Sequence, residues 1–483
     1  MGRKVTDYLL YRWRYILGYG VIGLIVVSLL IVATLFVPGA LSQEEMQSVV
    51  TSSQPLKSLD PSLIVNFPYH LLQRASLSLF GVSILSIKLP SLILSLLSII
   101  GMFLLLRGWF RHNVAVLTTL LIVTTGQFLF LSQHGTPGII SVFWTVWMLV
   151  AALMISRRAR LGWLWKIILA GVVALSLYTP LSIYVVIALL SAVTLHPHLR
   201  YIVRRLPKLK TALAIIVGLI LLAPLAYTIW QHPQTGLTLL GVPQGSFDIK
   251  ANTVAALGNY LDFMSPAHGI YMAPLYGIGS LALIILGVLR LFTATYTARS
   301  YIITAWVILL IPVVILNPDS VGATFVPALL LMAMGVASLI SMWYSLFPRN
   351  PYARIVGLVP LIILMGGMLL TSVDRYINGY SYNPTLASQF SKDLQLLNRR
   401  MAMNAHAPAT LVVTESERPF YEVVAKYNGR LTVLTSTPAT LPPTVIISRE
   451  AHKPLENATP TRIVTSPAAE DSARFYVYKT DQK

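Results

Sequence analysis

Residues 15–46, YILGYGVIGLIVVSLLIVATLFVPGALSQEEM, join an apolar run directly to an acidic pair, Glu44-Glu45. The run from Tyr15 to Val37 is long enough to cross a bilayer as a helix, which takes about 20 apolar residues. It is too long for the apolar region of a signal peptide, and no small-residue cleavage site follows it. The sequence therefore predicts an uncleaved spanning helix, preceded by four basic residues: Arg3, Lys4, Arg12 and Arg14.

The composition extends this prediction to most of the chain. The 483 residues are 55% hydrophobic and 11% charged, with a mean hydropathy of +0.71, whereas soluble proteins carry about 25% charged residues. Cysteine is absent, which excludes disulfides and thiolate chemistry. We expect an α-helical polytopic membrane protein with about 11 spans, at about residues 15–37, 84–106, 114–132, 139–156, 163–180, 181–195, 211–229, 272–293, 301–316, 324–346 and 355–373.

The charged residues sort onto the two sides that these spans define. Of the 23 basic residues in the first 372 positions, 19 fall on the side of the N-terminus, and six of the seven acidic residues fall on the other. Because cytoplasmic flanks retain Lys and Arg, we predict a multi-pass protein of the plasma membrane with a cytoplasmic N-terminus. The net charge of +19 is explained by these flanks, so no nucleic-acid partner is expected. The predicted outer side keeps only four cations: Lys57, Arg74, Lys88 and Lys250.

Two outer loops are long, at about residues 38–83 and 231–271. Loops of this length in a compact protein are usually functional. Within the first loop, residues 62–83 are apolar but carry polar side chains at three- and four-residue steps. This spacing makes one polar helical face, so we predict an amphipathic helix in the membrane interface rather than a further span. The polar face consists of Asn66, His70, Gln73 and Arg74.

The composition changes after about Ser372, where 13 basic and 10 acidic residues occur in 111 positions. We therefore divide the chain into a transmembrane domain, 1–372, and a soluble domain, 373–483, which the topology places outside the cytoplasm. Helices are predicted at Leu386–Met401 and Glu417–Tyr427. Because strands alternate with helices, a small α/β domain is expected, with strands at Thr410–Thr414, Leu431–Leu434, Thr444–Ser448, Arg462–Thr465 and Phe475–Lys479.

The acidic pair admits two interpretations. A carboxylate close to a low-dielectric boundary has a raised pKa, which suits a general base that takes a proton from a hydroxyl. Alternatively, Ser42 is a helix N-cap, and Glu44 and Glu45 lie in the first turn, where the helix dipole favours acidic side chains. The local sequence leaves both interpretations open.

Four further segments follow the pair in a characteristic order. They are FPYHLL at 67–72, LFGVS at 79–83, IKLPS at 87–91 and FLFLSQHGTPG at 128–138. This order resembles that of the GT-C membrane glycosyltransferases of the protein mannosyltransferase and aminoarabinose transferase type. Members show an acidic pair after the first helix, a proline-aromatic interfacial segment, "L-F-G-x-S" and "R-L-P-S", and then a short second outer loop. The resemblance covers about residues 15–200.

The chain departs from this family pattern at several positions. Its acidic pair begins with Glu44 instead of aspartate, Asn66 stands where a basic residue usually precedes two prolines, and Lys88 replaces the usual arginine. Gly138 follows Pro137 where the family usually has an aspartate.

The resemblance implies a GT-C-like fold and a sugar donor carried on a polyprenyl phosphate at the outer face of the membrane. Glu44 and Glu45 are the implied catalytic residues, and an acceptor lipid, glycan or protein takes the sugar. Outer cations would stabilise the leaving phosphate, although each also suits simple contact with lipid headgroups. The candidate substrate-binding residues are Lys57, Asp60, Tyr69, His70, Arg74, Lys88, His134 and Lys250.

No cluster of His, Asp or Glu has recognisable metal-ligand spacing in the sequence, so no metal ligands are assigned. Carboxylates from separate loops leave Mg²⁺ or Mn²⁺ open as a cofactor.

Two other functions remain open at this point. A transporter of lipid-linked glycans would place polar residues at mid-span, where this chain has few, Gln127 being one. A catalytically degenerate relative, whose C-terminal domain binds glycans or a partner protein, would explain the departures from the family pattern.

Overall fold

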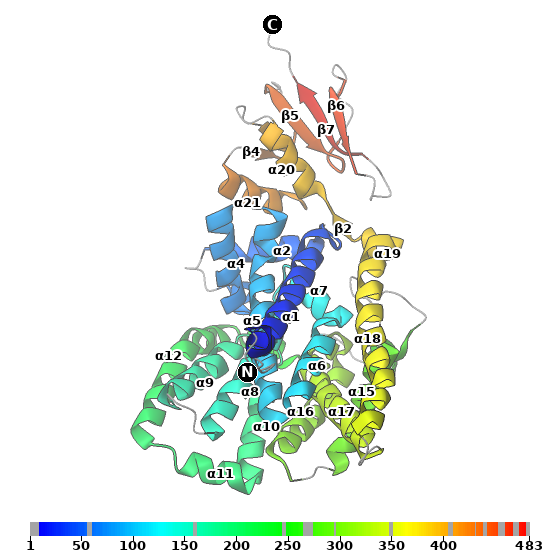
Figure 1. Cartoon of the computed structure of the whole chain (residues 1–483). Coiled ribbons are helices and arrows are strands. Elements are labelled where there is room, and N and C mark those ends of the chain that lie inside the picture. Colours follow the sequence, from blue (N-terminus) through cyan, green and yellow to red (C-terminus); the bar gives the residue numbers. More distant parts are fainter. Residues whose placement is uncertain are drawn as a thin grey trace.

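The structure is a computed structural model of the chain. It consists of a helical bundle with a small sheet domain on one end (Figure 1). The described residues are 9–55, 60–157, 162–243, 248–263, 274–293, 296–346, 351–403, 409–429, 431–437, 442–452, 459–466 and 473–479.

The predicted spans are all helical. In the described part of the chain, seven helices are long and apolar enough to cross a membrane, or nine if two bent pairs each count as one span. Two shorter apolar helices overlap two further predicted spans. The bundle helices are α1 (Leu9–Phe36), α5 (Ile84–Trp109), α6 (His112–Val123), α7 (Gly126–Gln133), α8 (Gly138–Ser156), α9 (Gly162–Ser176), α10 (Ser182–Leu195), α12 (Lys208–Gln231), α15 (Ile278–Thr293), α16 (Ala298–Leu316), α17 (Phe325–Leu346) and α18 (Pro351–Tyr382).

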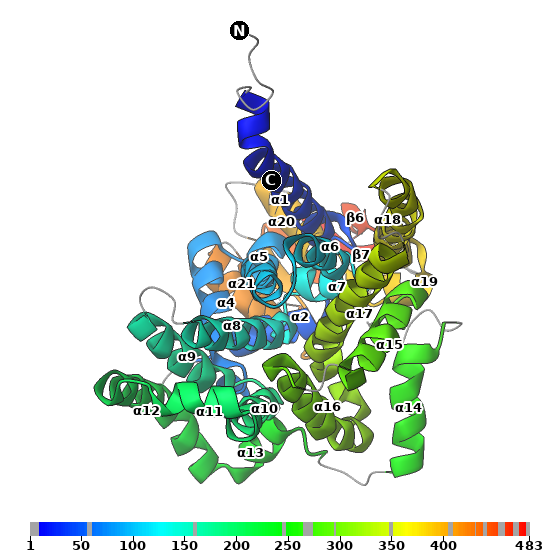
Figure 2. The ribbon, with the colours of Figure 1, turned by 60° about the horizontal axis from the view of Figure 1, so that its bottom comes forward.

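The predicted span 114–132 is a bent pair, because α6 and α7 meet at 64°. Thr125 lies in the break, where its side chain accepts a hydrogen bond from the Phe128 N–H and so caps α7. A second bend of 93° joins α10 to α11 (Pro197–Arg204). The predicted second outer loop contains α13 (Pro233–Leu240) and α14 (Ile249–Leu261). Figure 2 shows the first turns of α1 projecting beyond the other helices.

The first outer loop is folded at the end of the bundle that carries the sheet domain. It contains β1 (Leu41–Ser42), α2 (Gln43–Ser52), α3 (Pro61–Ile64) and α4 (Phe67–Phe80). As predicted, the segment after residue 60 is helical and is not among the helices that are long enough to span. Its amphipathic face is turned inward: His70 and Gln73 are buried, whereas Leu72 and Leu79 are exposed. An exposed apolar face suits contact with lipid rather than with water.

The sheet domain has five strands in the order β4-β3-β5-β7-β6. The strands β4, β3 and β5 are parallel to one another, and β7 pairs antiparallel with both β5 and β6. As expected, α21 (Arg418–Asn428) connects the first two strands and ends at Gly429, whose φ is +68°. The strands are β3 (Ala409–Val412), β4 (Leu431–Leu434), β5 (Thr444–Ser448), β6 (Arg462–Thr465) and β7 (Ala473–Lys479).

The predicted helix Leu386–Met401 is interrupted. The chain instead forms α19 (Pro384–Ala387), β2 (Phe390–Ser391) and α20 (Asp393–Met403). The interruption has a tertiary cause, since β2 pairs antiparallel with β1 from the first outer loop. The preceding helix α18 runs on to Tyr382, past the predicted domain boundary at Ser372.

The sheet domain rests on the turn between α4 and α5. The Asn428 side chain accepts a hydrogen bond from the Val82 N–H at 2.8 Å, and its amide donates to the Val82 carbonyl at 3.2 Å. Asn398 donates to the same carbonyl at 3.0 Å. Apolar side chains of both domains form one cluster around these bonds, including Leu77 and Phe420. The LFGVS segment at residues 79–83 is therefore a contact site between the helical bundle and the sheet domain.

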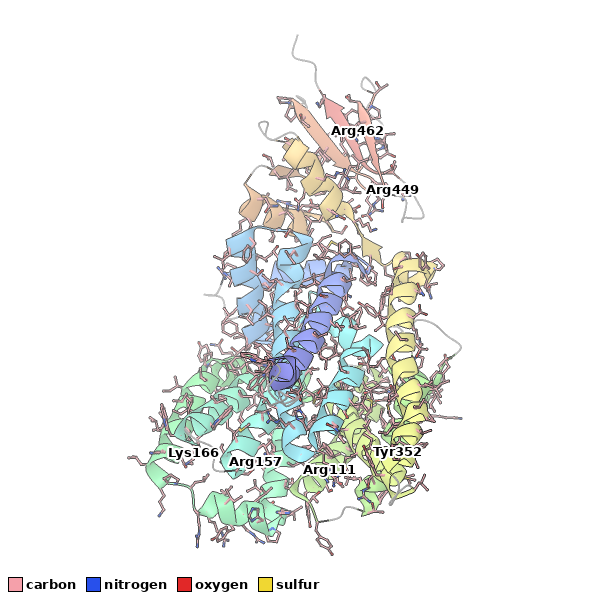
Figure 3. All side chains as sticks on the ribbon, viewed as in Figure 1. Arg111, Arg157, Lys166, Tyr352, Arg449 and Arg462 are labelled. Carbon is pink, nitrogen blue, oxygen red and sulfur yellow. The ribbon has the colours of Figure 1, made fainter. Side chains whose placement is uncertain are left out.

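Three basic residues that the sequence assigns to the side of the N-terminus lie together at one end of the bundle. Figure 3 places Arg111, Arg157 and Lys166 at the end of the bundle away from the sheet domain. The acidic pair lies in α2, at the opposite end. The two ends of the bundle therefore differ in charge, which is the basis on which we predict that the sheet end faces away from the cytoplasm.

Gly81 provides a test of the contact between the domains. Its φ is +68°, and a Cβ there would lie 2.8 Å from the Asn428 Oδ1 atom. We expect Gly81→Ala to loosen the sheet domain, because both backbone strain and this clash oppose it. Limited proteolysis between residues 383 and 409 should become faster. Gly23→Ala is the control, since a Cβ there meets nothing within 4 Å. Unchanged proteolysis of Gly81→Ala would contradict the described contact.

Candidate functional site

The two glutamates of the acidic pair have different surroundings. Glu45 is fully buried, whereas Glu44 is exposed on the first turn of α2. The Ser42 side chain accepts a hydrogen bond from the Glu45 N–H at 3.2 Å, and one Glu45 carboxylate oxygen accepts from the Ser42 N–H at 2.8 Å. This is a capping box. The capping interpretation of the sequence is therefore confirmed for Ser42 and Glu45.

The Glu45 carboxylate also holds the loop that follows α7. Its Oε1 atom accepts a hydrogen bond from the Gly135 N–H at 2.6 Å. A Cβ at Gly135 would lie 3.2 Å from the same oxygen, so the absence of a side chain lets the carboxylate approach the backbone. Glu45 thereby joins the loop after α1 to the loop after α7.

Lys88 completes this buried arrangement from α5. Its Nζ atom lies 3.6 Å from the Glu45 Oε1 atom, and neither side chain is exposed to solvent. The ammonium also donates to the Gln133 Oε1 atom at 2.7 Å. Because an isolated buried charge is very costly, each of these two charges depends on the other.

His134 lies beside the ion pair and hydrogen-bonds within the protein through both ring nitrogens. Its Nε2 atom is 2.9 Å from the Ser42 Oγ atom, and its Nδ1 atom is 2.8 Å from the Thr136 Oγ1 atom. Burial lowers the pKa of His134 to about 4, so the ring is neutral near pH 7. The structure thus places His134 inside the protein, holding the loop.

Tyr69 and His70 of α4 are also buried and bonded internally. The Tyr69 hydroxyl lies 2.8 Å from the Ser91 Oγ atom, and burial raises its pKa. The His70 Nδ1 atom lies 2.8 Å from the Ser52 Oγ atom, and burial lowers its pKa to about 4. Both residues therefore link α4 to its neighbours.

Glu44 has no ion pair or hydrogen bond to any residue that the structure describes. Its pKa is raised, first because it is partly removed from solvent and second because the Glu45 charge is close. An exposed carboxylate with a raised pKa accepts a proton more readily than an ordinary surface glutamate. The buried partner also fixes its position on the first turn of α2.

The remaining predicted residues are dispersed. Asp60 caps α3 by accepting from the Ser62 N–H at 3.0 Å, and Arg74 donates to the Gln54 carbonyl at 3.0 Å. Lys250 is exposed on α14, and Lys57 lies outside the described residues. The structure therefore brings together Glu45, Lys88, His134, Tyr69 and His70, but it does not gather the predicted cations.

A cavity of about 300 Å³ lies between α7, α15 and α18. One wall is Phe130, which stacks on Tyr380 on one side and on His134 on the other, with ring centroids 5.6 and 4.6 Å apart. Polar side chains in the lining include Gln127 and Arg375, together with several hydroxyl-bearing residues. The cavity is thus coupled by direct stacking to the residues that hold the acidic pair.

Sequence reasoning missed Arg375. Its signal was available, because an arginine near the predicted outer end of a span runs against the usual charge bias. The count of outer cations ended at residue 372, where the domain boundary was set, whereas α18 continues to Tyr382.

The sequence analysis noted Gln73 only as part of a polar helical face. It links three segments by donating to the Gly135 carbonyl at 2.9 Å and accepting from Ser48 and Ser52 at 2.9 and 2.6 Å.

Among the residues described, no group of three or more His, Asp or Glu side chains is placed to hold a metal ion.

The buried ion pair predicts that removing one charge lowers the stability of the protein and that removing both charges restores most of it. Glu45→Gln leaves the Lys88 ammonium buried without its counter-charge, which costs about 3–5 kcal/mol. Glu45→Gln combined with Lys88→Met removes both charges and should recover most of that stability. Thermal unfolding of the purified proteins measures the difference. A double variant no more stable than Glu45→Gln would contradict the assigned pairing.

The buried histidines predict a loss of stability in acid. Burial lowers their pKa values to about 4 from an ordinary 6.5, so between these values the unfolded chain binds more protons. Their contribution is complete above about pH 6.5 and falls by about 1.4 kcal/mol per pH unit per histidine as pH drops toward 4. Thermal unfolding of His134→Asn should show a shallower dependence on pH than wild type. Equal slopes would show that His134 is not held neutral.

The chain is similar to known proteins in part of its sequence and in its fold. Residues 67–228 match the family model of dolichyl-phosphate-mannose-protein mannosyltransferases. Among solved structures, ArnT from Cupriavidus metallidurans in the apo state aligns with a TM-score of 0.53 at 14% identity, covering 96% of this chain and 98% of that one. ArnT from the same organism bound to undecaprenyl phosphate aligns with a TM-score of 0.50 at 16% identity, covering 97% and 99%.

No curated protein matches the sequence significantly. At these identities the structural likeness shows the fold alone. The family match covers the segments at 67–72, 79–83, 87–91 and 128–138, but not the acidic pair Glu44-Glu45. The resemblance in fold that the sequence predicted is thereby confirmed: the chain has a GT-C-like arrangement of membrane helices with a small sheet domain.

Proposed function

We propose that the protein transfers a sugar from a polyprenyl-phosphate-linked donor to an acceptor at the outer face of the membrane. The observation that carries this proposal is the division of the acidic pair: Glu45 is fully buried among fixed partners, and Glu44 is exposed beside it. The likeness to ArnT, which has been solved with bound undecaprenyl phosphate, supports a donor of this class.

Glu44 is the proposed general base. It would take the proton from an acceptor hydroxyl, whose oxygen then forms a bond to the anomeric carbon of the sugar. The bond from that carbon to the donor phosphate breaks, and its electron pair leaves with the lipid phosphate. The raised pKa of Glu44 favours proton uptake, because a base works best when its pKa approaches the working pH.

Glu45 and Lys88 are proposed as positioning residues rather than as groups that touch substrate. Both are fully buried, and the two Glu45 oxygens already accept backbone hydrogen bonds from Ser42 and Gly135. Their proposed role is to hold α2 so that Glu44 points away from the protein core.

The departing phosphate needs a cation. Arg375 lines the 300 Å³ cavity between α7, α15 and α18, and Arg74 is half-buried on α4. We propose the cavity for the sugar-phosphate end of the donor, since it combines Gln127 and Arg375 with apolar walls, which suits a ligand with a polar head on a lipid chain. Lys57 and Lys250 remain candidates for contact with the lipid surface.

If Glu44 is the general base, its replacement should reduce sugar transfer without lowering the stability of the protein. Glu44→Gln keeps the size of the side chain but cannot take a proton, so transfer should fall about a hundredfold or more. Gln43→Ala, on the same exposed turn, is the matched control. Lipid extracts of a strain lacking the protein should contain an accumulated polyprenyl-linked sugar, which wild type and Gln43→Ala should clear and Glu44→Gln should not.

Two results would oppose the proposal. Clearance of the lipid-linked sugar by Glu44→Gln at wild-type protein levels would remove Glu44 from the reaction. Absence of any accumulating lipid-linked sugar would argue against the donor class itself and favour a degenerate relative.

A further inference from the structure

A polar pocket in the sheet domain is separate from the proposed reaction site. It has a volume of about 360 Å³, which is within the range of small-molecule sites. Most of its lining is charged, with carboxylates and guanidinium groups interspersed. The lining residues are Asp393, Glu417, Ser448, Arg449, Glu450 and Arg474.

The pocket lies where the topology of the sheet changes direction. The chain passes from β3 to β4 on one side, and then returns across β3 to β5 on the other side. Glu417 follows β3, and Ser448 ends β5. The pocket is therefore at the carboxyl ends of two neighbouring parallel strands whose connections lead in opposite directions. In open α/β sheets, such a switch point is the usual place for a ligand.

The inner part of the pocket is pre-organised by hydrogen bonds. Arg474 forms a two-pronged ion pair with Asp393, in which the Nε atom lies 2.7 Å from the Asp393 Oδ1 atom. One oxygen of Glu417 accepts hydrogen bonds from the Thr414 N–H at 3.2 Å and from the Ser448 hydroxyl at 2.7 Å. These bonds fix the carboxylates and the guanidinium group before any ligand arrives, which lowers the cost of binding.

The rim of the pocket is accessible. Arg449 and Glu450 follow β5 and are exposed. The six lining residues carry three negative and two positive charges, so the pocket does not favour an anion. Its carboxylates accept hydrogen bonds and its guanidinium groups donate them. A ligand with many hydroxyl groups, which both donate and accept, matches this surface.

The pocket is connected to the acidic pair through the pairing of β1 with β2. Asp393 begins α20 directly after β2, and β2 pairs with β1, in which Ser42 lies opposite Phe390. Glu44 follows β1 by two residues. Figure 3 shows Arg449 at the edge of the sheet domain that faces the helical bundle. Asp393, one of the lining residues, therefore closely follows a strand that pairs with the segment just before Glu44.

We infer that this pocket binds an uncharged sugar unit of a glycan. The pocket is formed by other residues than the proposed reaction site, so sugar binding here stands apart from the transfer reaction, and a failure of one does not imply a failure of the other. If the protein transfers sugars as proposed, the bound unit belongs to an acceptor glycan held over the outer end of the bundle.

The test uses the full chain in lipid nanodiscs and saturation-transfer NMR. The probes are the methyl glycosides of glucose, galactose and mannose, with sodium sulfate as an anion probe. At least one glycoside should receive saturation at millimolar concentration, and sulfate should not compete with it. Arg449→Ala and Glu450→Gln should each weaken binding about tenfold. Arg462→Ala is the control, because Arg462 is exposed on β6 of the same domain and outside the pocket.

Glu44→Gln should bind the glycoside like wild type, which separates this site from the reaction site. The inference is overturned if none of the three glycosides binds, if sulfate displaces them, or if Arg449→Ala and Glu450→Gln bind as wild type does. Both rim residues are exposed, and thermal unfolding of each variant, expected to match wild type, separates a loss of binding from a loss of fold.

Discussion

The buried carboxylate of Glu45 is the constraint on which the sheet-bearing end of the helical bundle depends. It caps α2, bonds the Gly135 backbone and faces the Lys88 ammonium, so that one charged group joins three segments. A charge in such a dry place is tolerated only with its counter-charge and its hydrogen bonds in place. The position of Glu44, one residue earlier, follows from this arrangement rather than from any contact of its own.

A second consequence concerns the sheet domain. The segment between α1 and α2, which Glu45 caps, contains β1. This strand pairs with β2, which lies just before the sheet domain in the chain. Asn398 and Asn428 of the sheet domain hydrogen-bond to the Val82 backbone. Val82 lies in the turn before α5, the helix that carries Lys88. The acidic pair, the ion pair and the sheet domain are therefore joined by a continuous set of contacts.

Much of the fold was predictable because it depends on local composition. Apolar length located the spans, and an N-cap at Ser42 was one of the two interpretations that the local sequence offered; the structure shows the cap and adds the reciprocal bond from Glu45. The strands of the sheet domain were found by their β-branched residues. The partners of Glu45 were not predictable, since Lys88 and Gly135 are distant in the chain and only packing brings them together. Arg375 was missed because helix α18 passes through a change in composition that looked like its end.

The central claim is that Glu44 is exposed and Glu45 is buried, at the end of the bundle that we predict to face outward. The chain contains no cysteine, so a single introduced thiol reports its own accessibility to a membrane-impermeant maleimide in intact cells. Glu44→Cys should react within minutes, whereas Glu45→Cys combined with Lys88→Met should react only after denaturation. Equal reaction at both positions, or reaction of Glu44→Cys only after the cells are opened, would contradict the account.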